Sequence, residues 1–399
     1  MLTPAAAQAL IEQHLAELPV ESLPLQQCAG AVLREDIYAE RDQPPFDRVA
    51  MDGIALDSRG LATGVRVLRI QGMQPAGDPP QTLEGANVCI EVMTGAVLPV
   101  GCDAVIPVEQ LSVRGSEAHL AADLAVLPWQ NIHRRATDTR QGALLLRAGV
   151  RLDAPEIAIA ASAGMARIKV AAQPAIAVIS TGNELIEPGD AVLPHQVRRS
   201  NVYAIVAALK RQGFGRVADD HARDDLRQLT ARLEFHLDTH DVLILSGGVS
   251  MGRLDLVPRA LADLKVRRIF HKVAQRPGLP LWFGVASSGA AVFALPGNPV
   301  STLVCVARYV MPALFAMMGA TAREPQKIAL GAPVTVKPAL AFFMPVHLES
   351  DDEGRTWAMP RPTNGSGDFT ALAGTDGFVE LPPGPMTYSK GFVTRLHRW

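Results

Sequence analysis

The chain has 399 residues, a hydrophobic content of 48% and 20% charged residues, which excludes a largely disordered protein. At roughly 100 to 200 residues per domain, this length suggests two to four domains. Lys and Arg number 38 against 40 Asp and Glu, which argues against a protein that binds nucleic acid mainly through bulk charge. The four cysteines lie far apart and include no C-x-x-C pair, so their spacing predicts neither a zinc site nor a disulfide framework.

Two apolar segments bear on the cellular location. The first residues, MLTPAAAQALIEQHLAELPVESL, lack a basic region before the apolar one, so they predict an amphipathic helix and not a signal peptide. The apolar stretch from 299 to 320 is interrupted by Arg308 and Pro312, which predicts a buried core helix rather than a membrane span. We therefore expect a cytoplasmic protein.

Changes of pattern along the chain predict four domains. Helical spacing ends near Pro24, and short apolar runs separated by Gly and Pro then indicate β structure. Helical spacing returns after Gly142, so residues 1–24 and 139–172 are expected to form one discontinuous domain around an inserted β-rich domain, residues 25–138. The pattern over residues 173–324 predicts an α/β domain, and the pattern over residues 325–399 predicts a small C-terminal β domain.

The α/β domain is expected to contain a doubly wound, mostly parallel sheet. The runs AIAVIS, DVLILS and AVFALP are apolar without alternation, as in strands that are covered on both faces. Apolar residues at helical spacing over 202–209 and over 254–264 predict crossover helices. The predicted fold class is α/β plus β: a multidomain protein with this α/β domain, the inserted β-rich domain and a C-terminal domain like a small β-barrel.

Small polar residues follow each of these three strands. The carboxyl ends of parallel strands meet at one edge of a sheet, where ligands bind. Glycines let main-chain N–H groups approach an anion, and hydroxyl groups add donors. The three segments therefore predict a site for a phosphorylated ligand. Its predicted binding residues are Thr181 and Gly182, then Gly247, Gly248, Ser250 and Gly252, and finally Pro296, Gly297, Asn298 and Ser301.

Charged residues near these segments fit the same ligand. Glu184 and Asp255 are predicted to hold Mg²⁺, which prefers oxygen ligands and often bridges to phosphates. Lys272 and Arg276 would neutralise phosphate charge, with a solvated surface pair as the alternative. Asp224 starts a helical pattern, so its alternative role is a charge at a helix N-terminus.

Two shorter motifs point to other chemistry. The segment GVSMG at 248–252 matches the G-x-S-x-G nucleophile elbow, but the residues that would complete a triad fit only loosely. They are Asp255 with His271 or His347. His236 and His240 have the spacing of zinc ligands on a helix but no third ligand, so a solvated helix end is the favoured interpretation.

Six motifs together resemble the molybdopterin molybdenumtransferases, known as MoeA in bacteria and as the E domain of gephyrin in animals. They are AMDGIA at 50–55, MTGAVLPVGCDAVIPVE at 93–109, STGNEL at 180–185, SNVYAI at 200–205, SGGVSMGRLD at 246–255 and LPGNPVS at 295–301. The resemblance implies a cytosolic homodimer of four-domain subunits, in which the partner subunit completes the active cleft. It also implies contacts with other proteins of molybdenum cofactor biosynthesis.

The resemblance implies a reaction as well. Molybdate, Mg²⁺ and adenylated molybdopterin are used, the adenylate is cleaved, AMP leaves, and molybdenum enters the dithiolene of the pterin. Such chemistry needs positioning and charge neutralisation rather than a covalent nucleophile. The resemblance implies that Asp52 and Thr94 reach the cleft from the inserted domain and that Asp138 matches a family acidic position. It implies an acidic set near the pyrophosphate and metal, formed by Glu184, Asp224 and Asp255, and a basic set formed by Lys272 and Arg276. Ser301 and Ser366 would line the oxyanion pocket.

The chain departs from the family pattern mainly in positive charge. The family segment K-P-G-K-P is RPGLP at 276–280, so Leu279 replaces a cation, and both arginines of R-x-E-F-x-R are absent from 340–345. Milder changes are Ile54 for Tyr and Asn183 for Asp. A molybdate dianion in a closed pocket needs positive charge. The alternative functions are therefore a diverged non-catalytic pterin-binding carrier or scaffold and, third, an unrelated phosphotransferase.

Overall fold

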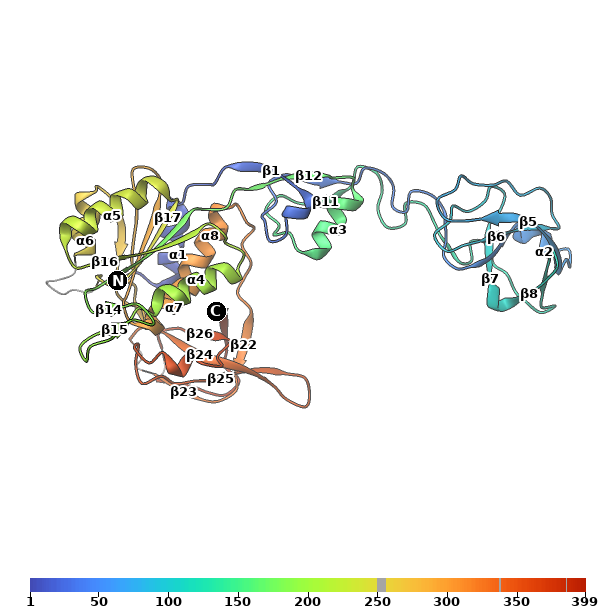
Figure 1. Ribbon diagram of the computed structural model, residues 1–399. Helices are drawn as coiled ribbons and strands as arrows, with labels where there is room; N and C mark the ends of the chain where they lie inside the picture. Colours follow the sequence, from blue (N-terminus) through green and yellow to red (C-terminus); the bar gives the residue numbers. More distant parts are fainter. Residues whose placement is uncertain (250–255, 337–338, 385) are drawn as a thin grey trace. The chain divides into compact units, whose positions relative to one another are not determined.

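The structure is a computed structural model that describes residues 1–249, 256–336, 339–384 and 386–399 (Figure 1). The chain forms two compact units. Unit 1 contains residues 1–35, 148–153 and 167–399, and unit 2 contains residues 36–147 and 154–166. The four predicted domains divide the chain differently, because residues 1–24 lie in unit 1 whereas most of residues 139–172 lie in unit 2, and their boundaries stay predictions.

A six-stranded sheet forms the centre of unit 1, in the strand order β16-β13-β17-β21-β20-β18. The first four strands are parallel, whereas β20 is antiparallel to both of its neighbours. The bounds are β13 Ile176–Thr181, β16 Val217–Ala222, β17 Val242–Ser246, β18 Arg267–His271, β20 Trp282–Val285 and β21 Ala291–Leu295. The three predicted apolar runs are β13, β17 and β21, which lie side by side, and the mostly parallel sheet is confirmed.

Helices cover both faces of this sheet, as its apolar strands require (Figure 1). Alternate residues of one strand enter opposite cores: in β13, Ile176 and Val178 pack on one side, and Ala177 and Ile179 on the other. The first core includes α1 Pro4–His14, α4 Asn201–Arg211, α7 Pro299–Cys305, the π-helical turn η3 Val306–Val310 and α8 Met311–Met317, and the second includes α5 Leu226–Thr239 and α6 Val257–Asp263.

The two helices predicted from apolar segments are both present. Thr3 caps α1 by accepting a hydrogen bond from the Ala6 N–H at 3.2 Å. The segment Pro299–Met317 is long and apolar enough to cross a membrane, but 67% of its most apolar window is buried inside the protein. This burial confirms the prediction of a core helix.

The C-terminal strands form a small closed barrel, in which β24, β25, β22, β28 and β26 follow one another and β26 pairs back to β24. The bounds are β22 Lys327–Leu330, β24 Ala341–Ser350, β25 Thr356–Pro360, β26 Gly377–Leu381 and β28 Val393–Arg398, with a short ladder of β23 Val334–Thr335 and β27 Thr387–Tyr388 and the turn η4 Thr370–Leu372. The strand β19 Gln275–Arg276 pairs with β24. The barrel is therefore joined to the α/β part, and the predicted fold class is confirmed.

Unit 2 is built on a second six-stranded sheet, in the order β7-β4-β6-β5-β9-β8. Its bounds are β4 Gly53–Leu56, β5 Val67–Gln74, β6 Val88–Val92, β7 Ala104–Pro107, β8 Leu111–Arg114 and β9 Glu117–Leu120. The unit also contains β2 Ile37–Tyr38, β3 Arg48–Val49, α2 Ser58–Leu61, η2 Val108–Gln110, β10 Ile132–His133, β11 Leu144–Leu146 and α3 Ala154–Ser162. In unit 1, β1 Val20–Pro24, followed by η1 Leu25–Gln27, pairs with β12 Arg167–Ala171.

Candidate active site

The carboxyl ends of β13, β17 and β21 lie at one edge of the sheet. Ser180 of β13 pairs with Ser246 of β17, which pairs in turn with Leu295 of β21. Because the strands are parallel and in register, the segments that follow them start at the same level. The structure thus brings the three segments of the sequence analysis together.

A cavity of about 820 Å³ lies at this edge. It is lined by residues of all three segments, including the carboxylate Glu184 of the first, and by Asp224, which follows β16. The predicted residues that line it are Thr181, Gly182, Glu184, Asp224, Gly247, Gly248, Pro296, Gly297 and Asn298. Unit 1 alone supplies this lining.

Glycine is required at two of these positions by both backbone angle and space. Gly247 and Gly248 have φ values of +101° and +69°, which side chains rarely adopt. A Cβ atom on Gly247 would lie 2.8 Å from the Thr181 carbonyl oxygen, and one on Gly248 would lie 2.9 Å from Thr181 Oγ1. The second segment therefore packs directly against the end of β13.

The Thr181 hydroxyl is a buried group that lacks a partner. Thr181 is 5% exposed, and within the described part of the chain its Oγ1 makes no hydrogen bond. A buried hydroxyl without a partner is costly, and buried polar groups in proteins are nearly always satisfied. A ligand oxygen in the cavity would remove this cost.

Asp224 contacts the cavity and does not cap a helix. Its main-chain N–H donates to Asn183 Oδ1 at 3.1 Å, and its own Oδ2 accepts from the Asn183 N–H at 3.2 Å. The cap of α5 is the next residue, Asp225, which accepts from the Gln228 N–H at 2.8 Å. The side-chain cap of α5 is therefore Asp225, and Asp224 lies one residue before it.

Several other predicted residues are not among those that line the cavity. Ser301 is 3% exposed inside α7, and Ser366 Oγ accepts a hydrogen bond from Asn298 Nδ2 at 2.7 Å. Lys272 follows β18 directly, and Arg276 is exposed on β19. Ser250, Gly252 and Asp255 lie outside the described residues, so the Ser250 triad and the Asp255 part of the Mg²⁺ site stay predictions.

One polar group of lining residues was not predicted from the sequence: Ser180, Arg198, Arg199, Ser200, Asn201 and Ser246. Asn201 Nδ2 donates to the Gly297 carbonyl at 2.8 Å and to Ser246 Oγ at 2.9 Å, and so ties two of the three segments to the start of α4. The motif SNVYAI at 200–205 contains Ser200 and Asn201 and was a signal for them, but it served only as part of the family resemblance. A crossover helix that starts at the carboxyl edge also places its first side chains in the site.

A polar network lies behind the cavity. Arg199 Nε donates to Ser180 Oγ at 2.7 Å, and His221 Nδ1 lies 3.1 Å from the same hydroxyl. Burial, with the charge of Arg199 second, lowers the pKa of His221 below its ordinary value. This shift favours the neutral form of the His221 side chain.

The expectation that His236 lies on a solvated helix end is wrong. Its side chain is buried on α5, and its Nε2 lies 3.0 Å from Asp220 Oδ2 on the neighbouring strand β16. His240 is the C-terminal cap of the same helix. Among the described residues, no group of three or more His, Cys, Asp and Glu side chains is placed to hold a metal ion.

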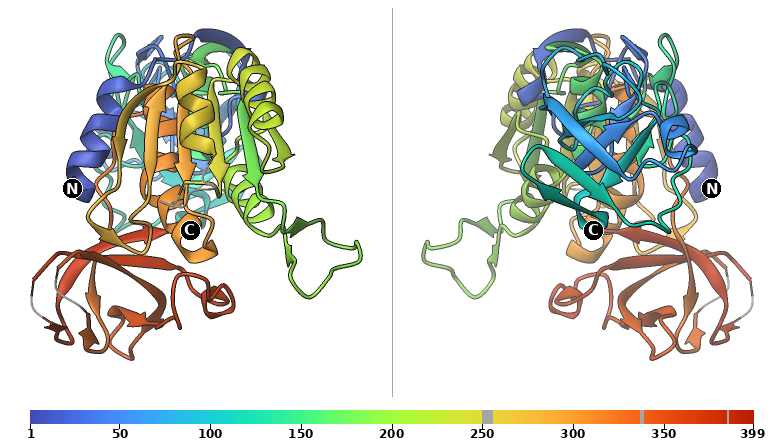
Figure 2. Two further views of the ribbon diagram at one scale, coloured as in Figure 1. Left: turned by 90° about the vertical axis from the view of Figure 1, so that its left-hand side faces the viewer. Right: turned by 90° about the vertical axis from the view of Figure 1, so that its right-hand side faces the viewer.

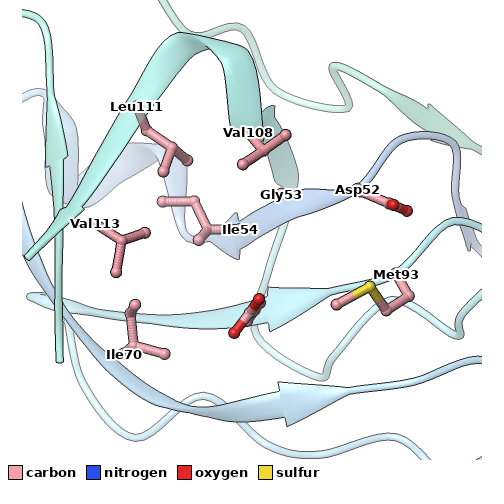
Figure 3. Close-up of a pocket in the computed structure, with 9 residues that line it drawn as sticks. Asp52, Gly53, Ile54, Ile70, Met93, Val108, Leu111 and Val113 are labelled. Atoms are coloured by element: carbon pink, nitrogen blue, oxygen red, sulfur yellow. The ribbon is translucent and has the colours of Figure 1, made fainter. Parts of the chain in front are cut away.

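Asp52 and Thr94 lie in unit 2, where they contact each other. The Thr94 N–H and hydroxyl both donate to Asp52 Oδ1, at 2.7 and 2.6 Å, and these bonds lower the pKa of Asp52. Asp52 also lines a cavity of about 230 Å³ whose walls are mostly apolar and include Ile54 (Figure 3). Asp138, the matched acidic position, pairs with His133 at 2.9 Å.

Known families and solved structures match this chain over nearly its whole length. The MoeA N-terminal region (domains I and II) matches residues 2–164, a probable molybdopterin-binding domain matches residues 177–316, and the MoeA C-terminal region (domain IV) matches residues 327–393. Among solved structures, a molybdopterin biosynthesis MoeA protein from Pyrococcus horikoshii is 30% identical with a TM-score of 0.79, covering 100% of this chain and 99% of that one.

Curated relatives agree with these matches over their full length. A molybdopterin molybdenumtransferase from Synechocystis sp. is 36% identical over 400 residues, covering 100% of both chains. One from Synechococcus elongatus is 34% identical over 395 residues, covering 96% of each. The chain therefore belongs to the MoeA family of molybdopterin molybdenumtransferases.

Proposed function

We propose that this chain inserts molybdenum into adenylated molybdopterin, in a reaction that uses molybdate and Mg²⁺ and releases AMP. The observation that supports this function is the cavity at the sheet edge, where three glycine-containing segments and an unsatisfied threonine hydroxyl converge. Backbone N–H groups and hydroxyls of this kind bind phosphate oxygens. They would hold the pyrophosphate of the substrate.

The residues of the cavity would act mainly by positioning. Gly247 and Gly248 bring main chain close to the ligand, and Thr181 offers a hydroxyl donor that no described residue uses. Cleavage of the phosphoanhydride develops charge on phosphate oxygens, and fixed donors stabilise it without reorganising. An oxygen of water or of molybdate would attack phosphorus and break the phosphoanhydride, so that AMP leaves and the pterin keeps its phosphate. The two dithiolene sulfurs would then bind molybdenum, and one molybdate oxygen would leave as water with the two thiol protons.

The carboxylate of Glu184 fits a role in holding Mg²⁺. A Cβ atom on Gly182 would lie 2.5 Å from Glu184 Oε2, so the glycine leaves the space in which this carboxylate lies at the cavity wall. Glu184 would hold the ion together with Asp255. The ion would supply positive charge to the phosphate oxygens.

This function is tested by incubating the purified protein with adenylated molybdopterin, molybdate and Mg²⁺, and measuring AMP by chromatography. AMP release that depends on molybdate is expected, and the Asp224→Asn variant should release it more slowly. A wild-type protein that releases no AMP, or releases it equally without molybdate, would contradict the proposal.

The missing cations favour a second candidate function, a pterin-binding carrier or scaffold without insertase activity. Pro345 stands in buried strand β24, where an arginine side chain would have to be buried. Leu340 and Leu279 are half-buried, so cations at these two positions could reach solvent or a ligand.

The double variant Leu279→Lys, Leu340→Arg separates the two functions. If lost cations have abolished insertion, the wild type binds the pterin without releasing AMP, and the double variant gains activity. If the wild type already releases AMP, the carrier function is rejected. A protein whose melting temperature rises with nucleotides but not with the pterin would instead fit the phosphotransferase alternative.

The assembly and location are part of the same proposal. We expect a cytoplasmic homodimer in which Asp52 and Thr94 of one subunit act at the cavity of the other. Other molybdenum cofactor biosynthesis proteins are the expected partners for delivery of the adenylate.

A further inference from the structure

Two consecutive arginines lie where a loop returns to the cavity. The strands β14 Leu185–Ile186 and β15 Val197–Arg198 pair with each other, and the loop between them extends away from the body of unit 1 (Figures 1 and 2). Arg198 ends β15, and Arg199 follows it. Both residues line the cavity, but their surroundings differ.

The charge of Arg199 is already neutralised by protein groups. The residue is 6% exposed, and its guanidinium forms ion pairs with Glu187 and, at 3.0 Å, with Asp219. Its Nε donates to Ser180 Oγ, and its Nη2 also donates to the Asp220 carbonyl at 3.0 Å. All three guanidinium nitrogens already donate to protein groups, so Arg199 is a positioning residue that anchors the base of the loop.

The charge of Arg198 is retained. Its side chain is exposed, and its Nη1 donates to the main-chain carbonyls of Glu187 and Asp190, both at 2.7 Å. Carbonyl oxygens fix one side of the guanidinium without cancelling its charge. Within the described part of the chain Arg198 forms no ion pair, and Nε and Nη2 make no hydrogen bond.

The charges of the other lining residues make this cation important. Glu184 and Asp224 contribute two carboxylates to the cavity wall, and Arg199 is balanced by Glu187 and Asp219. Among the described lining residues, Arg198 is the cation that remains unpaired. Without Arg198, the described lining would present net negative charge to a phosphate, which is unfavourable.

We propose that Arg198 binds a phosphate group of the ligand in the sheet-edge cavity. The carbonyl bonds at Nη1 hold the guanidinium in place, and Nε and Nη2 present the two parallel donors that suit a phosphate. The identity of the ligand as an adenylated pterin rests on the proposed function, whereas the preference for a phosphate rests on Arg198 itself.

The test is calorimetric titration of the full-length protein with inorganic pyrophosphate. Loss of a charge-assisted pair is expected to weaken binding about tenfold or more in Arg198→Gln. Arg198→Lys keeps the charge but loses the fork, so its loss should be smaller. Arg216→Gln is the matched control, because Arg216 is also exposed and donates to one main-chain carbonyl, but lies at the opposite, amino end of the strands.

The melting temperature of each variant separates binding from folding, because loss of Arg198 should leave it near that of the wild type. Equal pyrophosphate affinity of the wild type and Arg198→Gln, or no binding by the wild type, would overturn the proposal. If Arg198→Gln loses pyrophosphate binding while the wild type binds it but releases no AMP, the Arg198 proposal is supported and the insertase function is rejected. If AMP is released and Arg198→Gln changes neither binding nor rate, only the Arg198 proposal fails.

Discussion

The Thr181 hydroxyl lacks a hydrogen-bond partner in the described structure, and a ligand would supply one. In Thr181→Val, the free energy of unfolding without ligand is expected to rise by about 1 kcal/mol, because one unsatisfied buried hydroxyl is removed. Pyrophosphate binding should weaken in the same variant. Urea unfolding and calorimetric titration measure the two effects.

Thr302 provides the matched control for this prediction. It is also buried, but its Oγ1 donates to the Pro296 carbonyl at 2.6 Å. Thr302→Val should therefore lower the free energy of unfolding, opposite in sign to Thr181→Val. A loss of similar size in both variants would show that Thr181 is satisfied in the folded protein.

Gly247 is expected to tolerate no side chain. In Gly247→Ala the new Cβ meets a main-chain oxygen 2.8 Å away at a φ of +101°, so the free energy of unfolding should fall by about 2 kcal/mol or more. Gly213→Ala measures the cost of the positive φ angle alone, because Gly213 has a φ of +93° and open space around it. It should lose about 1 kcal/mol. Equal losses in the two variants, measured by urea unfolding, would contradict the packing argument.

At the level of elements, local sequence patterns predicted the strands and helices, but they did not predict contacts that depend on a neighbouring element. Uninterrupted apolar runs predicted β13, β17 and β21, and small polar residues after them predicted the cavity edge. The burial of His236 was missed because its partner, Asp220, comes from β16 and leaves no mark in the spacing of α5. The two-residue strands β14 and β15 are too short to show any periodicity, so the residues they bring to the cavity were missed as well.

The contact between η3 and the barrel should depend on pH. Glu380 Oε2 accepts from Arg308 Nε at 2.9 Å and lies 3.1 Å from His397 Nε2. Burial lowers the pKa of His397 below its ordinary value of 6.5, and the bond to Glu380 only partly opposes this. Burial raises the pKa of Glu380, but His397 and Arg308 outweigh it and hold that pKa below its ordinary value.

Both depressed pKa values have the same consequence for stability. The contribution of each of these two side chains to folding stability is fully present above its ordinary pKa. It is lost as the pH falls through the lower pKa of the folded state, so acid destabilises the barrel contact. Between about pH 7 and about pH 5, the melting temperature of His397→Gln should fall less than that of the wild type, because glutamine keeps a donor but does not titrate. Identical pH profiles would exclude His397 as the source.

At the level of the whole molecule, the predicted site residues are divided between two units. The cavity with Glu184 belongs to unit 1, and Asp52 with Thr94 belongs to unit 2. Hydrophobic pattern and turn residues predict how each unit folds, but not which surfaces of two chains meet. The resemblance to the MoeA family supplied the proposal that one subunit's Asp52 acts at the partner's cavity.

Subunit mixing tests this proposal with two variants that should each be inactive, Asp52→Asn and Glu184→Gln. In a mixed dimer with shared sites, one site combines the intact Glu184 of one chain with the intact Asp52 of the other. Random exchange at equal amounts makes half of the dimers mixed, with one active site of two, so AMP release should recover to about a quarter of the wild-type rate. If each site takes both residues from one chain, no mixture can regain activity. The control is a mixture of Glu184→Gln with Asp224→Asn, two cavity residues of one unit, which should stay at the level of the separate variants under either arrangement.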